Sequence, residues 1–423
     1  MRSLVAVALL LAALVSLSCR KDTPVVGPDS TASLFLGDTK PFKPATRAAM
    51  EGVYRVVQGQ DFFGDLVALK WSGVANGVDT TFYLSGFFGR DAAYFVLSTG
   101  SLDSTLFFSG QWRKLMTTES GLFHGVVLSH AGGRQLMNPA PVIGKDSITI
   151  SGTWGNGEEN PTKYIVLQYD RPLYRGKDLE IIGHRGGGRT SDLLPVSENS
   201  VEIIEYAERL GCTAIEIDVR PTKDGVPVLY HDNTLNLRLV QKNGLMGKME
   251  DYTYDQLQGL IRLIHGERLP TFREALDVAL YRTQIRMVYI DTKPTMPVQS
   301  LYEIQQEYIQ KATAAGRRFE LLIGLPSDEK VAEFKAIPNY TQVPSLCELT
   351  VDETRALNSR VWCPRFTQGT QNDLVAQVHA EGRRAFVWTL DSPPYINEFL
   401  TNGNFDGILT NYASMVAYYH YVR

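Results

Sequence analysis

The feature that most restricts the fold is a repeated strand-then-helix pattern that begins at Leu179. Short apolar runs alternate there with stretches that are compatible with helices. Eight strand units can be distinguished, and they are EIIGH (180–184), TAIEIDVR (213–220), RMVYIDTK (286–293), FELLIGL (319–325), QVPSLCEL (342–349), RVWCPRF (360–366), RAFVWTLD (384–391) and FDGILTNY (405–412). Every unit except the last is followed by a stretch that fits a helix.

Eight such units predict a (β/α)8 TIM barrel over residues 173–423, with functional side chains at the C-terminal ends of the strands. The alternative is a doubly wound open sheet. No dinucleotide-binding glycine motif follows any of the strands, so the sequence gives that alternative no support.

A different pattern occupies residues 49–172. Eight β-type runs without a helical period, separated by Gly, Asn, Asp and Ser, are GVYRVV (52–57), LVALKW (66–71), TTFYLSGFF (80–88), AYFVLS (93–98), TLFFSGQW (105–112), LFHGVVLS (122–129), SITISGTW (147–154) and KYIVLQY (163–169). They predict an all-β antiparallel domain, closed as a barrel or folded as a sandwich. Trp71, Trp112 and Trp154 could line a ligand cavity, but in a barrel of this size we expect them in the core.

The N-terminus has the features of a targeting segment. Arg2 precedes an apolar run from Leu4 to Leu17, which is too short to span a bilayer but suits a signal peptide over residues 1–18. Ser18 and Cys19 resemble a bacterial lipoprotein cleavage box, which predicts lipidation of Cys19; the alternative is an ordinary signal peptide cut nearby. Residues 19–48 would then be a tether. This interpretation predicts a cell-envelope protein, periplasmic or on the surface, held at a membrane by its lipid anchor.

Charge and cysteine content exclude several classes of protein. The net charge of the 423 residues is −4, and no Lys/Arg-rich run is present, so a nucleic-acid partner is not expected. Cys212, Cys347 and Cys363 are scattered in apolar surroundings and odd in number, which favours buried free thiols over a disulfide framework. The β domain shows no acid–base cluster. We therefore expect a non-catalytic module that spaces the barrel from the membrane or binds a ligand that the sequence does not identify.

The unit TAIEIDVR places two acids on one face of a strand. Ile215, Ile217 and Val219 alternate with Glu216 and Asp218, so in a barrel the apolar residues face the helices and the acids face inward. Like charges there need a cation or protonation. Carboxylate oxygens suit Ca²⁺ or Mg²⁺ better than zinc. The alternative is an inward salt-bridge layer with Arg220 and lysines of neighbouring strands.

Further ionisable groups follow the ends of the first three strand units. His184 and His231 could flank one site as an acid–base pair, because histidine titrates nearest to neutrality. Arg185 offers a planar fork for a phosphate, and Lys293 offers a point charge. Asp291 adds a third acid. Such a set at matched strand ends predicts a catalytic site.

The motifs HRG, SENS, IEIDVRPTKDGVPVLYHDNTL, YIDTKP, VWTLD and FDGILTN, in this order, resemble the glycerophosphodiester phosphodiesterase family. The resemblance covers nearly all of residues 179–416. It implies a TIM barrel of the PLC-like phosphodiesterase type that hydrolyses small-molecule glycerophosphodiesters to glycerol 3-phosphate and an alcohol, with a divalent metal. The implied roles are catalysis for His184 and His231, substrate binding for Arg185, Lys293 and Trp388, metal ligation for Glu216, Asp218 and Asp291, and support of these groups for Glu198 and Asn199.

Three departures from the family pattern bear on these roles. The third metal ligand is usually Glu, whereas Asp291 is shorter. The loop between Arg185 and Glu198 is longer than usual, and Asn411 replaces the Asp that is common after the last strand. The β domain is not part of the family pattern at all.

Two other functions are open at this point. A phospholipase, C- or D-like, acting on intact phospholipid would need an apolar rim over the site, and the segment after His231 is mixed in character. A binding protein with a decayed barrel would have lost ionisable groups first, yet all of them are present. Which histidine is the acid, and whether water or a glycerol hydroxyl attacks, does not follow from the sequence.

Overall fold

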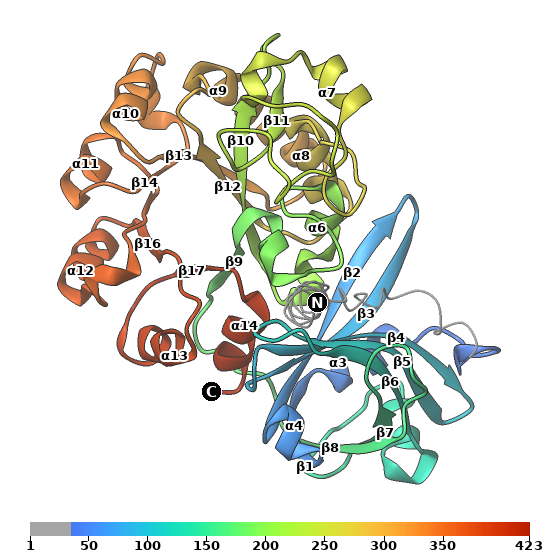
Figure 1. Ribbon diagram of the computed structural model, residues 1–423. Helices are drawn as coiled ribbons and strands as arrows, with labels where there is room; N and C mark the ends of the chain where they lie inside the picture. The colour runs from blue at the N-terminus through green and yellow to red at the C-terminus, as the bar shows by residue number, and fades with distance from the viewer. Residues whose placement is uncertain (1–34) are drawn as a thin grey trace, which may run out of the picture.

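The computed structural model describes residues 35–423, which form two barrels joined by a short connection (Figure 1). The predicted signal peptide, Cys19 and most of the predicted tether lie outside the described residues. Within residues 35–423 no helix combines the length and the apolar character needed to cross a membrane. Cys212, Cys347 and Cys363 are buried and free, as predicted.

The first barrel is an antiparallel meander in which β1 pairs with β8 and closes the sheet. Its strands are β1 (Gly52–Gln58), β2 (Leu66–Asn76), β3 (Asp79–Phe88), β4 (Ala93–Leu102), β5 (Thr105–Lys114), β6 (Ser120–Val127), β7 (Thr149–Trp154) and β8 (Lys163–Arg171). Short helices accompany it, namely α3 (Pro44–Met50), α4 (Gln60–Phe63), η1 (Ser129–Ala131) and α5 (Gly133–Leu136). The closed sheet confirms the predicted barrel and excludes the sandwich.

Aromatic side chains fill the inside of this barrel. Phe63 on α4 lies 5.5 Å, between ring centroids, from Trp112, and Trp112 lies 5.4 Å from Trp154. Trp112 and Trp154 are buried in the core, whereas Trp71 packs at its edge and donates from Nε1 to the carbonyl oxygen of Arg47. The core interpretation is therefore confirmed for Trp112 and Trp154.

The second barrel is a closed ring of eight parallel strands, as the sequence predicts. In ring order they are β9 (Glu180–Gly183), β10 (Ala214–Pro221), β12 (Met287–Thr292), β13 (Glu320–Leu325), β14 (Ser345–Cys347), β15 (Val361–Trp362), β16 (Arg384–Val387) and β17 (Gly407–Thr410). The short β11 (Pro227–Leu229) pairs antiparallel with β10. Ile215, Ile217 and Val219 belong to the layer between strands and helices, as predicted.

Helices surround this ring. They are α6 (Val201–Tyr206), α7 (Tyr254–Leu260), α8 (Phe272–Tyr281), α9 (Val298–Ala314), α10 (Asp328–Lys335), α11 (Val351–Ala356), α12 (Asn372–Ala380), α13 (Pro393–Asn402) and α14 (Ala413–Tyr421). Single 3-10 turns are η2 (His184–Gly186), η3 (Thr190–Asp192), η4 (Ala207–Leu210), η5 (Met249–Asp251), η6 (Tyr340–Gln342) and η7 (Phe366–Gln368). The start of α8 has a capping box, because Thr271 and Glu274 exchange hydrogen bonds between side chain and backbone.

The expectation that no helix follows the last strand is wrong, because α14 follows β17 directly. This helix contacts β9 and β17 on one side and β2, β3 and β4 of the first barrel on the other. A helix that is buried on several sides is apolar all round and lacks the amphipathic period by which surface helices are recognised. At the same junction Gly211 has φ +97°, and a Cβ there would lie 2.6 Å from the Cβ of Ala417. Only glycine fits this close approach.

Candidate active site

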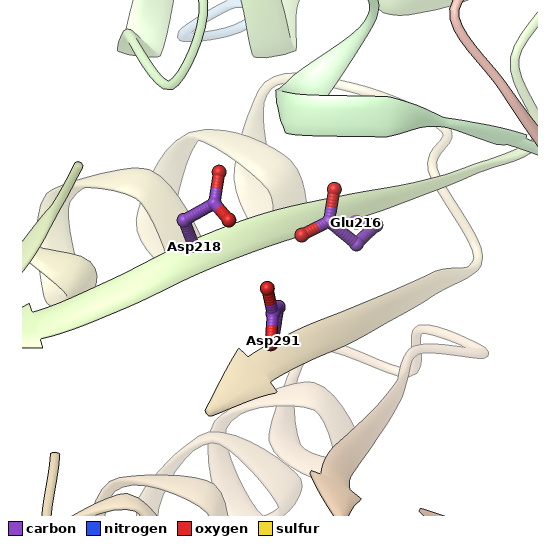
Figure 2. A group of neighbouring side chains, drawn as sticks. All are labelled: Glu216, Asp218 and Asp291. Carbon is purple, nitrogen blue, oxygen red and sulfur yellow. The ribbon is translucent and has the colours of Figure 1, made fainter. Parts of the chain in front are cut away.

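Three carboxylates meet at the C-terminal end of the TIM barrel (Figure 2). Glu216 and Asp218 point inward from β10, and Asp291 lies on the neighbouring strand β12. The parallel register pairs Asp218 with Asp291, so these two side chains emerge next to each other. One oxygen from each of the three carboxylates lies within 4.8 Å of the others. A single cation could therefore contact all three.

Lys293 compensates part of the negative charge. Its Nζ lies 2.5 Å from Asp218 Oδ1 and 2.5 Å from Asp291 Oδ2. This ion pair corresponds in part to the salt-bridge alternative raised by the sequence. Arg220 takes no part in it, because its guanidinium pairs with Glu250 at 3.3 Å.

Glu216 has no such cationic partner. It is 2% exposed, its Oε2 accepts a hydrogen bond from the backbone N of Arg185 at 2.7 Å, and its Oε1 has no partner within residues 35–423. Burial, and then the charges of Asp218 and Asp291, raise the pKa of Glu216 well above its usual value. When all three carboxylates are ionised, they and Lys293 together carry a net charge of −2. Oxygen ligands with this balance fit a divalent cation such as Ca²⁺ or Mg²⁺.

The turn after β9 directs Arg185 toward two partners. Arg185 has φ +55°, a left-handed conformation that costs a non-glycine residue on the order of 1 kcal/mol or more. Its backbone N donates to Glu216, while its Nη1 donates to Glu198 Oε1 at 2.7 Å. The buried Nε of Arg185 has no partner in the described part of the chain. Glu198 thus uses only part of the donor capacity of this guanidinium.

A chain of hydrogen bonds holds His184 and fixes its tautomer. Asp391 accepts from Asn411 Nδ2 at 2.6 Å, so Asn411 Oδ1 faces His184 Nδ1 at 2.7 Å. Because Oδ1 can only accept, Nδ1 carries the hydrogen. Burial, and then the charge of Arg185, lower the pKa of His184 to about 4. At neutral pH Nε2 therefore has a free lone pair, and it lies 3.8 Å from Glu216 Oε2.

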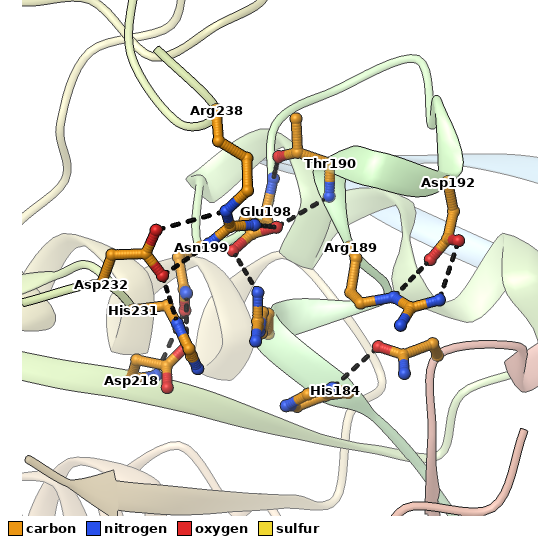
Figure 3. Close-up of polar contacts among 12 residues, drawn as sticks. His184, Arg189, Thr190, Asp192, Glu198, Asn199, Asp218, His231, Asp232 and Arg238 are labelled. Atoms are coloured by element: carbon orange, nitrogen blue, oxygen red, sulfur yellow. Dashed lines mark hydrogen bonds and ion pairs between the residues drawn. The ribbon is translucent and has the colours of Figure 1, made fainter. Parts of the chain in front are cut away.

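His231 has an acidic partner of its own, Asp232 (Figure 3). Its Nδ1 lies 2.7 Å from Asp232 Oδ1. Arg238 donates to Asp232 Oδ1 at 2.7 Å and to Glu198 Oε2 at 3.0 Å. Although burial opposes the shift, the charge of Lys293, and then those of His231 and His184, lower the pKa of Asp218. Both histidines thus act on the same carboxylate.

Glu198 and Asn199 connect these parts. Glu198 is 2% exposed and joins Arg185 on one oxygen to Arg238 and the backbone N of Thr190 on the other. Asn199 donates from Nδ2 to Asp218 Oδ2 at 2.6 Å and accepts from the Asp218 backbone N at 3.2 Å. This pair of bonds orients the Asp218 carboxylate.

Trp388 is less closely connected to the group. It follows β16, packs against the inside of the barrel and donates from Nε1 to the carbonyl oxygen of Cys363 at 3.1 Å. The guanidinium of Arg365 lies 4.8 Å from the centre of its ring. The described contacts do not join Trp388 to the carboxylates or the histidines.

Several residues that the structure places at this end of the barrel have no role predicted from the sequence. Asp391 lies in the VWTLD motif and Arg238 follows the YHD motif, so their strand-end positions were a usable signal. Glu348, just after β14, accepts a hydrogen bond from Tyr289 on β12. Burial raises the pKa of Glu348 to about 7. Its position at a strand end was the only indication in the sequence.

The barrel that carries this site is similar to known proteins. The sequence profile described as "Glycerophosphoryl diester phosphodiesterase family" matches residues 184–415. The rat protein "Glycerophosphodiester phosphodiesterase 1" is 31% identical over 153 residues, which are 34% of this chain and 43% of the rat protein. The corresponding mouse and human proteins are matched over 34% of their lengths. The chain thus spans less than half the length of these relatives.

Two other known proteins are matched over most of their own lengths. "Glycerophosphodiester phosphodiesterase" of Caldanaerobacter subterraneus subsp. tengcongensis is 26% identical over 241 residues, which are 55% of this chain and 93% of the relative. A solved glycerophosphodiester phosphodiesterase structure from Parabacteroides distasonis is 25% identical, with a TM-score of 0.45, over 57% of this chain and 96% of the other. The family profile does not extend over the strands β1 to β8.

Proposed function

The chain belongs to the glycerophosphoryl diester phosphodiesterase family, and we propose that it hydrolyses glycerophosphodiesters to glycerol 3-phosphate and an alcohol. The observation that carries this proposal is the group of three carboxylates flanked by His184 and His231 at one end of the barrel. An acid–base pair beside a cation site is what hydrolysis of a phosphodiester requires.

The proposal includes a divalent cation held by Glu216, Asp218 and Asp291. It is supported by the buried Oε1 of Glu216, which has no partner within residues 35–423, and by the crowding of three carboxylates around one cation, Lys293. When bound, such a cation would neutralise charge on the phosphate oxygens. Asn199 would keep the Asp218 carboxylate in place, and the guanidinium of Arg185 would bind a phosphate oxygen with a donor that Glu198 does not use.

The two histidines would move protons at defined atoms. His184 would accept the proton of the attacking oxygen at Nε2, because its Nδ1 hydrogen is engaged by Asn411 and its lowered pKa keeps the ring neutral. His231 would donate a proton to the departing alkoxide, and the Asp232 carboxylate would stabilise the charged ring before that transfer. Detection of a cyclic phosphate by 31P NMR would show whether a substrate hydroxyl, rather than water, attacks.

The decisive experiment is an assay of the purified protein with a panel of glycerophosphodiesters and intact phospholipids, with and without a chelator. We expect release of glycerol 3-phosphate that stops on chelation and returns with Ca²⁺ or Mg²⁺. A Glu216→Gln variant is the matched control for metal binding. Full turnover after verified removal of metal would contradict the metal-dependent mechanism, and no turnover of any glycerophosphodiester would contradict the function.

Intact phospholipid is the second candidate substrate. Leu237 is 67% exposed and Met246 is 81% exposed, and both lie on the segment after His231. Exposed apolar side chains near a catalytic end could contact lipid chains. The same assay separates the two, because a phospholipase would hydrolyse vesicles in preference to soluble diesters. A decayed barrel receives no support, since the ionisable groups are present and joined by hydrogen bonds.

The membrane anchor and the division of the chain at about residue 172 are also proposed. The anchor is supported by the sequence around Cys19, and the division by the change of pattern after the β-type runs. Mass spectrometry of the mature N-terminus, with Cys19→Ala as the control, tests the anchor. A membrane-bound Cys19→Ala protein would contradict it.

A further inference from the structure

A buried arginine of the first barrel contacts the active-site loop of the second. Arg113 on β5 is 3% exposed, and its Nη2 donates to the backbone oxygen of Asp192 at 3.0 Å. Its Nε has no partner within the described residues. Burying a guanidinium costs free energy unless the group is paired. The cost of burying Arg113 therefore has to be offset by a gain elsewhere in the fold. Asp192 lies in the long loop between β9 and α6 that departs from the family pattern.

The side chain of Asp192 holds a second arginine. Arg189 donates from Nε to Asp192 Oδ2 at 2.9 Å and from Nη2 to Asp192 Oδ1 at 3.0 Å (Figure 3). Tyr412 donates its hydroxyl to Asp192 Oδ1 at 3.2 Å. A two-point pairing of this kind fixes both the position and the plane of a guanidinium.

Arg189 lies near the residues that hold His184 (Figure 3). Tyr412, which contacts both Arg189 and Asp192, directly follows Asn411, the residue that holds His184. The side chain of Arg189 is 32% exposed. Its described hydrogen bonds use Nε and Nη2, which leaves Nη1 for a ligand.

The other cations of the site are also paired with carboxylates. Lys293 is paired with Asp218 and Asp291, and Arg185 is paired with Glu198 through Nη1. These two cations therefore balance the charge of an anionic diester only in part, and Nη1 of Arg189 adds a further donor.

We propose that the β-barrel is part of the substrate-binding apparatus: Arg113 fixes Asp192, and Asp192 orients Arg189 as an additional cation for the anionic phosphodiester. Arg189 is then a substrate-binding residue and Arg113 a positioning residue. The proposal rests on the proposed function, and it replaces the simple spacer role expected for this domain. The added domain and the lengthened loop would then act together to position Arg189.

The test compares steady-state kinetics of the full chain with those of Arg189→Ala, Arg113→Met and the double variant, using glycerophosphocholine. We expect each single change to raise KM about tenfold with kcat within about threefold, because one charge-assisted contact with the substrate is lost. If Arg113 acts through Arg189, the double variant will resemble Arg189→Ala, and the two effects will not multiply. Arg113→Lys keeps the charge and should recover part of the loss.

The matched control is Gln111→Met. Gln111 is also buried on β5 and donates to Tyr206 Oη at 2.9 Å, so this change removes a contact between the barrels without touching the loop. It should lower Tm and leave KM unchanged. If Arg113→Met does not fold, Asp192→Asn takes its place, because it keeps the backbone oxygen but loses the charge that orients Arg189.

Binding of glycerol 3-phosphate by calorimetry provides a second readout, and we expect Arg189→Ala and Arg113→Lys to bind it more weakly than the wild-type protein. The proposal is overturned if folded Arg113 and Arg189 variants keep the wild-type KM and affinity, or if their effects multiply. A wild-type protein that hydrolyses no glycerophosphodiester would instead overturn the proposed function.

Discussion

Replacing Lys293 with Met should strengthen metal binding while it weakens catalysis. Lys293 lies 2.5 Å from one oxygen of Asp218 and one of Asp291, so it occupies the edge of the space in which a cation would bind. With all three carboxylates ionised, the substitution changes the net charge of the four-residue cluster from −2 to −3.

The size of the effect can be estimated from the geometry. A divalent ion among these oxygens would lie about 5 Å from the ammonium, and with an effective dielectric constant of about 20 the repulsion is about 7 kcal/mol. Proton uptake by the metal-free cluster would offset much of this gain, since the pKa of Glu216 is already raised. We therefore expect an increase in affinity of about tenfold to a hundredfold at pH 8.

Calorimetric titration with Ca²⁺ or Mg²⁺ measures this directly, and Lys293→Arg, which keeps the charge, is the control. Turnover of Lys293→Met should fall at saturating metal, since the cation that faces the substrate is lost. Unchanged or weaker metal binding by a folded Lys293→Met protein would refute the reasoning, because it would show that the ammonium does not compete with the metal.

Three further predictions concern other residues. His184→Ala and His231→Ala should each reduce turnover about a hundredfold or more with the fold retained, as measured by kinetics and circular dichroism; near-normal turnover would remove that residue from the acid–base pair. Asp291→Glu should retain activity with a changed metal preference in a metal-substitution assay, and an inactive variant that still binds metal would argue against Asp291 as a ligand. Burial lowers the pKa of His420 to about 4, below the value of about 6.5 in the unfolded chain, so the unfolded state binds the proton first and stability is lost as the pH falls from about 6.5 toward 4. Urea unfolding should show that the loss of stability between pH 7 and pH 5 is about 2 kcal/mol smaller in His420→Phe than in the wild-type protein, and an equal loss in that variant would refute the assignment.

The strands of both barrels could be predicted because their patterns are local. Alternation along β10 was sufficient to place Glu216 and Asp218 inside the ring and Ile217 outside it. The helix α14 could not be predicted in this way, because it is buried between two barrels and has no polar face. The pattern of a single segment does not show what lies on its other side.

The residues of the site could be predicted where an ionisable side chain directly follows the end of a strand. Asn411 was recognised as a departure from the family pattern, but its role depends on Asp391, which lies on a different strand end. The contact between Arg113 and Asp192 depends on how two barrels pack, and residues 79 positions apart carry no common period.

The closed, ring-filled interior of the first barrel has a mechanical consequence. A closed sheet has no free edge to fray, and interlocked aromatic rings such as Phe63, Trp112 and Trp154 resist deformation. The domain should therefore move as a rigid body. Because Arg113 lies on one of its strands, a displacement of this body relative to the second barrel would not be absorbed within it. The displacement would pass through Arg113 to the loop at Asp192. A force on the outside of the first barrel would therefore shift the loop that carries Arg189 in the second barrel.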